Sequence, residues 1–218
     1  MPAEKLIRSI KLIQLNLKSM GLLYFIPYVF LFLILPLSTY ISLTSGTAKE
    51  QCFLNSYFQI QMFCPFFAVW WTLFGFREFS EGKMRELLLV YQKSILKELI
   101  IVWVYYILHM IIMLVLYLCL FGFNYFHSMM ILTIQSFAFF SVGISLSFLI
   151  KNIALSFVIC ILYELIGMFG QIDILQPISM LSLSFPQNFF DGIVPYLFIL
   201  LVSMILLIFS NLFAKKYA

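Results

Sequence analysis

The chain has 218 residues, of which 64% are hydrophobic and only 10% are charged, and its formal net charge at pH 7 is +4. Soluble domains carry about 25% charged residues, so this composition excludes an ordinary soluble domain and predicts an integral membrane protein. The apolar runs do not alternate with polar residues as the strands of a membrane barrel do, which leaves spanning helices as the expected structure.

Six apolar runs are each long enough for a helix that crosses the bilayer, which needs about 20 residues. They lie at residues 22–44, 56–76, 99–122, 127–150, 152–171 and 193–213. We therefore expect one all-α transmembrane domain over residues 1–218, with six spans. The first run follows a basic stretch, but it is too long for a secretory signal, so we expect it to be retained.

The basic residues predict the orientation of these spans. Twelve of the 13 Lys and Arg residues fall on the side that six spans would share with both termini, and only Lys49 falls on the other. The positive-inside rule then places both termini and the segment 77–98 in the cytoplasm. This topology and the lipid headgroups account for the net positive charge, so no nucleic-acid partner is expected.

Residues 1–20 precede the first span and carry a regular apolar stripe. Its members recur at helical spacing and are Leu6, Ile10, Ile13 and Leu17. The stripe predicts an amphipathic helix that lies in the membrane interface. A disordered basic tail that serves only the topology is the alternative.

The segment between the second and third spans gathers charge. Residues 76–98 hold nine of the 22 acidic and basic residues. After Gly82, apolar residues again recur at helical spacing, at Met84, Leu87, Leu88, Tyr91 and Ile95. This predicts an amphipathic cytoplasmic helix, whose stripe needs a cover of lipid, bundle or partner. Anionic lipid would repel the flanking carboxylates, which favours a partner protein over lipid, while a plain solvated loop is the bland alternative.

This segment resembles a motif of ABC transporter permeases of the type-2 exporter class. The pattern E-x-x-x-G-x-x-x-x-L-L is matched by Glu78, Gly82, Leu87 and Leu88. Six spans with cytoplasmic ends and an amphipathic N-terminal helix are also similar to that family. The resemblance implies a coupling helix that docks on a cytoplasmic ATPase through Glu78, Glu81, Gly82, Met84, Arg85, Glu86, Leu87, Leu88, Tyr91 and Ile95.

The same resemblance implies partners and a role. Two copies of an ABC ATPase subunit and a second permease chain, identical or related, would complete the transporter in a bacterial plasma membrane. ATP and Mg²⁺ would bind to the ATPase, and this chain would bind no cofactor. The cargo would be a peptide or a hydrophobic compound, with antimicrobial peptide export or self-immunity as family roles.

Residues 172–192 are interrupted by Pro177 and Pro186, so they cannot form a span, yet they are too apolar for a free aqueous loop. We expect short outer or re-entrant helices between the fifth and sixth spans, as the family also has. An ordinary packed loop is the alternative.

Two ionisable side chains lie well inside expected spans, His109 in the third and Glu164 in the fifth. A charge at such a depth is costly, so each must face protein or water. Their depths are similar, which suggests that they could pair; both structural roles and roles in the transport path stay open. Gly167 and Gly170 permit close helix contact, and the family resemblance would place them at the seam between two permeases, whereas packing within the chain is the alternative.

No nucleotide-binding, protease or hydrolase motif occurs in the chain, and its four Cys residues have no metal-ligand spacing. We therefore expect a transport subunit and no enzyme activity. The substrate-binding subunit of an ATP-driven vitamin or metal uptake system is the second hypothesis, and an intramembrane enzyme built on His109 and Glu164 is the third.

Overall fold

The computed structural model describes residues 18–77, 81, 95–169 and 193–216, and these form helices and short connections without any strand. The expectation of an all-α chain is thus confirmed for this part of the sequence. The predicted interfacial helix at 1–17, most of the charged segment (78–80 and 82–94) and the outer segment at 170–192 lie outside the described residues.

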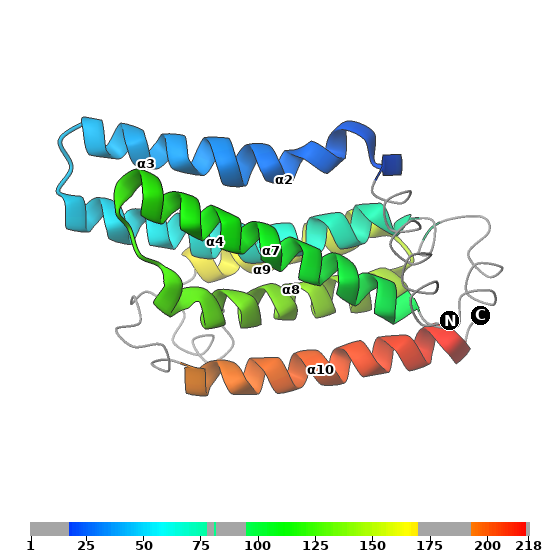
Figure 1. The fold of residues 1–218 in the computed structure, drawn as a ribbon. Coiled ribbons are helices and arrows are strands. Elements are labelled where there is room, and N and C mark those ends of the chain that lie inside the picture. Colours follow the sequence, from blue (N-terminus) through cyan, green and yellow to red (C-terminus); the bar gives the residue numbers. More distant parts are fainter. Residues whose placement is uncertain (1–17, 78–80, 82–94, 170–192, 217–218) are drawn as a thin grey trace, which may run out of the picture.

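Six helical rods make up the described structure (Figure 1). The first rod combines η1 (Gly21–Phe25), α2 (Ile26–Val29), η2 (Phe30–Ile34) and α3 (Leu35–Thr44). The others are α4 (Lys49–Gly75), α7 (Ile95–Phe121), α8 (Met129–Ile150), α9 (Ile153–Phe169) and α10 (Ile193–Lys216), with a 3₁₀ turn η3 (Phe126–Ser128) before α8.

Three of these helices are long and apolar enough to cross a membrane. They cover Gly21–Thr44, Leu96–Phe121 and Phe126–Ile150, and two shorter apolar helices cover Ile153–Ile166 and Tyr196–Ser210, in a search of the described residues. Length and composition therefore agree with a membrane protein.

The second rod is longer than its apolar run. α4 begins at Lys49, although the run begins at residue 56. A hydrogen bond between side chains stabilises the added turns. Gln51 Nε2 donates to Asn55 Oδ1, four residues later, at 3.0 Å. Helix propagation needs only the next backbone hydrogen bond, so a helix can continue past the end of its apolar stretch.

The first rod is irregular because it contains two prolines. Pro27 lies at the start of α2, where its missing N–H is harmless. Pro36 cannot donate to the carbonyl of Phe32, and the turn before it, η2, is a π-helical segment that re-routes the backbone bonds.

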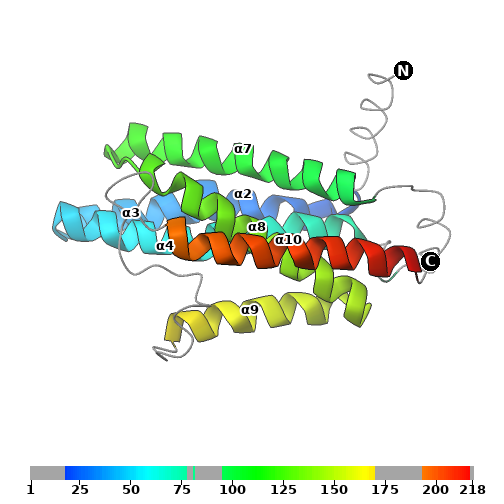
Figure 2. The ribbon, with the colours of Figure 1, turned by 90° about the horizontal axis from the view of Figure 1, so that it is seen from below.

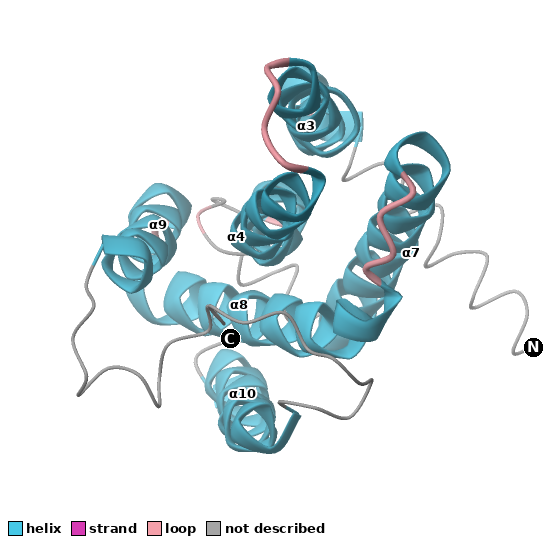
Figure 3. Ribbon diagram, turned by 90° about the vertical axis from the view of Figure 1, so that its left-hand side faces the viewer, coloured by secondary structure: helices cyan, strands magenta, loops and turns pink. Residues whose placement is uncertain are grey.

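The helix α8 forms the centre of the bundle. It packs most extensively on α10 and α4 and also contacts α9 (Figure 3). Its approach to α4 is close at Gly143, where an added Cβ would lie 2.7 Å from Cγ1 of Val69. Glycine is therefore required here by the contact between helices.

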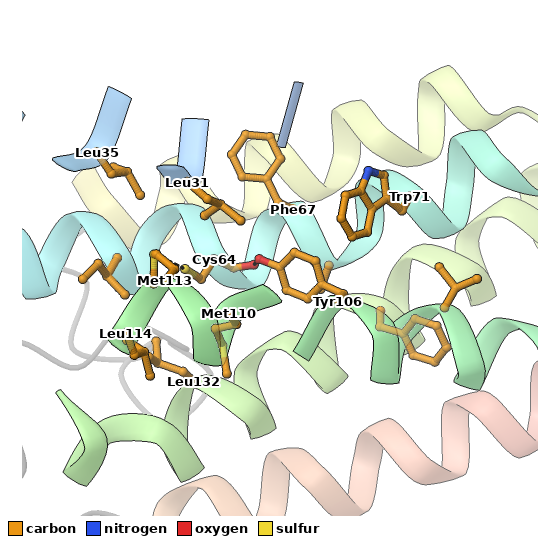
Figure 4. Packing of buried hydrophobic residues seen from close by; sticks show 14 of the residues in the cluster. Leu31, Leu35, Cys64, Phe67, Trp71, Tyr106, Met110, Met113, Leu114 and Leu132 are labelled. Atoms are coloured by element: carbon orange, nitrogen blue, oxygen red, sulfur yellow. Dashed lines mark hydrogen bonds between the residues drawn. The ribbon is translucent and has the colours of Figure 1, made fainter. Parts of the chain in front are cut away.

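The largest buried cluster lies between the first rod, α4, α7 and α8 (Figure 4). Leu31 and Leu35 reach it from the first rod, and Met110 and Met113 reach it from α7. Tyr106 is fully buried in it and donates its hydroxyl to the Cys64 carbonyl of α4. This layer fixes the first rod and α7 on α4.

Candidate functional site

A cluster of three tyrosines and a histidine joins the first rod to α7. Tyr24 and Tyr28 lie four residues apart on η1 and α2, and Tyr105 and His109 lie four residues apart on α7. This spacing puts each pair on one helix face, so two polar pairs meet between the rods. Trp71 of α4 contacts both tyrosines of the first rod and the imidazole.

The hydroxyls of the three tyrosines form a triangle. The Tyr24–Tyr28 oxygens are 3.0 Å apart, and the Tyr105 oxygen lies 3.1 Å from each of them. Tyr28 also lies 2.9 Å from Nε2 of His109. Four contacts of hydrogen-bond length therefore link four side chains that are each only partly buried.

The other imidazole nitrogen identifies the position of one proton. His109 Nδ1 lies 2.8 Å from the backbone carbonyl oxygen of Tyr105. A carbonyl can only accept, so Nδ1 carries a proton and donates it. In the neutral ring, Nε2 is then the acceptor of the Tyr28 hydroxyl.

Two tryptophans hold the start of the first rod in place. Trp70 Nε1 donates to the Leu23 carbonyl at 2.9 Å, and Trp71 Nε1 donates to the Tyr24 carbonyl at 3.0 Å. These carbonyls lie in the 3₁₀ turn, where regular α-helical bonds are missing. The two indoles thereby position Tyr24 and Tyr28 toward α7.

Glu164 lies on another side of the bundle and is 6% exposed. It belongs to α9, which is separated from α7 by α4 and α8 (Figures 2 and 3). The structure therefore does not bring His109 and Glu164 together; His109 bonds to the tyrosines, and none of the hydrogen bonds found between described residues involves the Glu164 carboxyl. The order of the helices around α8, which hydropathy does not reveal, decides this outcome.

A cavity of about 320 Å³ lies between α8, α9 and α10. Its walls are apolar almost throughout, and two lining residues, Tyr163 and Ser203, carry hydroxyls. The Ser203 hydroxyl donates to the Ile199 carbonyl at 2.6 Å. The cavity is lined by Phe139, Val142, Leu146, Ile159, Cys160, Tyr163, Phe198, Ile199, Val202, Ser203 and Leu206. Such a volume is at the lower end of the range for small-molecule sites and suits an apolar group.

Among the predicted docking residues, Glu81 has a described side chain, and it points into this chain. One carboxylate oxygen accepts from the backbone N–H of Ile153, the first residue of α9, and the other lies 3.0 Å from Arg77 Nε. Asn152 Oδ1 accepts from Leu155 N at 2.9 Å. The start of α9 is therefore capped by two side chains, the carboxylate of Glu81 and the amide oxygen of Asn152.

The remaining predicted residues are only partly placed. Ile95 is the first residue of α7 and Gly167 lies near the end of α9. The others lie outside the described residues, and they are Glu78, Gly82, Met84, Arg85, Glu86, Leu87, Leu88, Tyr91 and Gly170.

The connection between α7 and α8 is closed by a buried tyrosine. Tyr125 donates its hydroxyl to the Phe53 carbonyl of α4 at 2.9 Å and stacks on the ring of Phe53. Burial raises the pKa of Tyr125 above its ordinary value, so this hydroxyl stays protonated as a donor. The contact fixes the end of the bundle that holds Lys49.

The tyrosine triangle was not predicted from the sequence. Tyr24, Tyr28 and Tyr105 are ordinary interface residues by composition, and aromatic side chains are abundant at 19% of the chain. The available signal was the i,i+4 spacing of two tyrosines and of a tyrosine with His109. It could not show that the two pairs face each other.

The chemistry open to the cluster is the binding and exchange of a proton, and hydrogen bonding to a polar group. Among the described residues there is no group of three or more His, Cys, Asp or Glu that could hold a metal ion. Comparisons of the chain with family models, with curated proteins and with solved structures find no match.

Proposed function

We propose that the chain is a membrane-spanning permease subunit of an ATP-driven exporter of a peptide or hydrophobic compound. Six rods would cross a bacterial plasma membrane, with both termini in the cytoplasm. The partners would be two copies of an ABC ATPase and a second permease chain, with Gly167 and Gly170 at the seam. ATP and Mg²⁺ would be bound by the ATPase.

The charge distribution over the bundle supports this orientation. α4 and α8 end, and α7 and α9 begin, at one end of the molecule, which carries Arg77, Lys97 and Lys151 (Figure 1). The first rod also begins there, after Lys18, whereas Lys49 lies at the opposite end. A cytoplasmic face at the Arg77 end satisfies the positive-inside rule.

The observation that carries the proposal is the bond from Glu81 to the start of α9. Glu81 belongs to the segment that resembles a coupling element, and Arg77 ties it to the end of α4 at the same time. A motor that moved this segment would therefore pull on α9 directly. The apolar cavity between α8, α9 and α10 lies next to this helix and suits an apolar part of the cargo.

The test is the assembly and activity of a complex. The tagged chain would be purified from its own membrane, its partners identified by mass spectrometry, and ATP hydrolysis by the purified material measured. We expect an ABC ATPase to co-purify and Leu87→Asp with Leu88→Asp to abolish both its recovery and the hydrolysis. Lys49→Gln, at the opposite end, is the matched control and should leave both unchanged. An ATPase that stays bound to the double variant would exclude docking through this stripe.

A further inference from the structure

We propose that Tyr24, Tyr28, Tyr105 and His109 form a proton-binding site, in which the imidazolium form of His109 completes the hydrogen bonds of the hydroxyl network. This site does not depend on the transport proposal, because its argument uses only the geometry of the cluster. The ligand is a proton, and the site is built by two elements that lie far apart in the sequence.

The cluster has more contacts of hydrogen-bond length than protons to fill them. The cluster has four contacts, which are the three sides of the hydroxyl triangle and the contact from Tyr28 to Nε2. Each contact needs one proton between its two atoms. The neutral imidazole has its proton on Nδ1, where the Tyr105 carbonyl requires it, so only the three hydroxyl protons are available.

With the neutral ring, one of the four contacts therefore brings two lone pairs together. A proton taken up from solution by the Nε2 lone pair adds the missing donor, and no bond other than the new N–H is formed. Tyr24 can then donate to Tyr105, Tyr105 to Tyr28 and Tyr28 to Tyr24, while Nε2–H donates to the Tyr28 oxygen. All four contacts are then hydrogen bonds.

Three aromatic rings lie close to the imidazole of His109. The imidazole centroid lies 4.4 Å from the ring of Tyr105, 5.1 Å from that of Tyr28 and 5.4 Å from that of Trp71. These separations are within the range in which aromatic rings attract a cation. The imidazole itself makes two polar contacts, one to the Tyr28 hydroxyl and one to the Tyr105 carbonyl.

The titratable groups that face His109 are tyrosine hydroxyls. The first rod contributes the hydroxyls of Tyr24 and Tyr28, α7 contributes Tyr105, and α4 contributes the uncharged Trp71. None of the hydrogen bonds or ion pairs found among the described residues joins a carboxylate or another cation to the cluster. Protonation of His109 is thus governed by the hydroxyl network and the rings.

The site joins two rods that also share apolar packing and a 3.3 Å contact between the hydroxyls of Thr39 and Tyr117. Loss of the proton leaves one hydroxyl contact without a hydrogen bond. The three hydroxyl protons can still fill the three contacts between the rods, so the open contact is that between Tyr24 and Tyr28 within the first rod.

The experiment uses ¹⁵N-histidine NMR on the full chain in lipid nanodiscs across about pH 5 to 8, the range in which histidine changes its charge. The chain has two histidines, and the exposed His127 in η3 supplies a second set of signals for comparison. His127→Asn assigns the two sets of signals. We expect His109 to be an imidazolium at the acidic end and to become a neutral ring with its proton on Nδ1.

Tyr24→Phe is the decisive variant because it changes the count. It removes one hydroxyl proton and two contacts, so the two remaining contacts are filled by the Tyr28 and Tyr105 protons with a neutral His109. We expect the titration midpoint of His109 to fall by about one pH unit, a tenfold weaker proton affinity. Tyr40→Phe, an exposed tyrosine on α3, is the matched control and should leave the midpoint unchanged.

Two results would overturn the proposal. One is a neutral His109 in the wild-type chain that carries its proton on Nε2, which contradicts the assigned geometry without any variant. The other is a His109 midpoint that is the same in Tyr24→Phe and in the wild type. The melting temperature of the variant, measured by tryptophan fluorescence, shows whether it is folded, and the wild-type tautomer decides the matter if it is not.

Discussion

Gln61 is the polar residue whose burial in the bundle is hardest to explain by its contacts. It lies in the middle of α4, is 1% exposed, and neither its amide nitrogen nor its amide oxygen has a hydrogen-bond partner among the described residues. Gln59, two residues earlier, accepts from Ser38 Oγ at 2.7 Å. Gln59 is thus hydrogen-bonded between two rods, whereas Gln61 has no such bond among the described residues.

Gln61→Met should therefore stabilise the protein. The side chains are similar in length, and the substitution removes an unpaired amide whose burial costs about 1–3 kcal/mol. We expect a higher melting temperature in detergent, measured by tryptophan fluorescence. Gln59→Met is the matched control and should lower it, because the bond to Ser38 is worth about 1 kcal/mol. A lower melting temperature for Gln61→Met would mean that the amide has a partner in the assembled protein.

At this scale the sequence predicts which residues are unusual better than it predicts their partners. His109 and Glu164 stand out because charge is rare inside apolar runs, and both are indeed within helices. Their proposed pairing is not formed, because His109 faces Tyr28 while Glu164 lies on α9. A partner is chosen by the order of helices in space, which no local pattern encodes.

At the scale of elements, the closest helix contact depends on a missing side chain. Gly143 of α8 faces Val69 of α4, which is fully buried. Val69 is β-branched, so its χ1 angle is fixed in a helix and its methyl groups cannot turn aside. The two helices can approach closely only as long as position 143 has no Cβ.

Gly143→Ala should destabilise the bundle by about 1–3 kcal/mol, the usual range for overpacking. Val69→Ala in the same chain should recover most of the loss, because it removes the two methyl groups that the new Cβ would meet. A double-mutant cycle on melting temperatures measures this coupling. Additive losses would show that the two residues are not in contact.

The start of α9 depends on a residue from the preceding charged segment. Glu81→Ala removes the acceptor for the Ile153 N–H and the partner of Arg77. We expect faster hydrogen exchange in the first turns of α9, since an uncapped helix start opens more often. Glu50→Ala, at the start of α4, is the control and should not change exchange in α9. Unchanged exchange in Glu81→Ala would remove the link between the charged segment and this helix.

The rods themselves were predicted well from apolar runs, and their limits less well. The runs at 99–122 and 127–150 correspond to α7 and α8 within a few residues. α4 extends to Lys49 because a helix can continue into polar sequence, and the first rod contains 3₁₀ and π segments that hydropathy cannot register. Those irregularities follow from Pro27, Pro36 and the bonds that the tryptophans supply.

At the scale of the whole molecule, α8 is the helix on which the others are arranged. α4, α9 and α10 pack against it from different sides, and α7 and the first rod are joined to α4 (Figure 3). The cavity between α8, α9 and α10 and the tyrosine–histidine cluster therefore lie on different sides of the bundle. A ligand in one and a proton in the other would therefore bind to different parts of the bundle.

The number of rods that cross the membrane separates two topologies. If all six cross, residues 46, 122 and 182 lie outside the cell, and residues 81, 151 and 218 lie inside. If only the three longest apolar helices cross, Gly21–Thr44, Leu96–Phe121 and Phe126–Ile150, then residue 122 lies inside and residues 81 and 218 lie outside. The two topologies thus assign opposite sides to residues 81, 122 and 218.

Reporter fusions at these positions distinguish the two. Alkaline phosphatase is active only outside, so we expect activity after residues 46 and 122 and none after residues 81 and 218. Twelve of 13 basic residues on one side make this orientation strongly favoured, because Lys and Arg near a span resist translocation. Lys49→Gln is the control and should not change the pattern, since it only removes the single basic residue from the expected outer side. Activity after residue 218 with none after residue 122 would establish three spans and would exclude a permease whose two ends both face the cytoplasm.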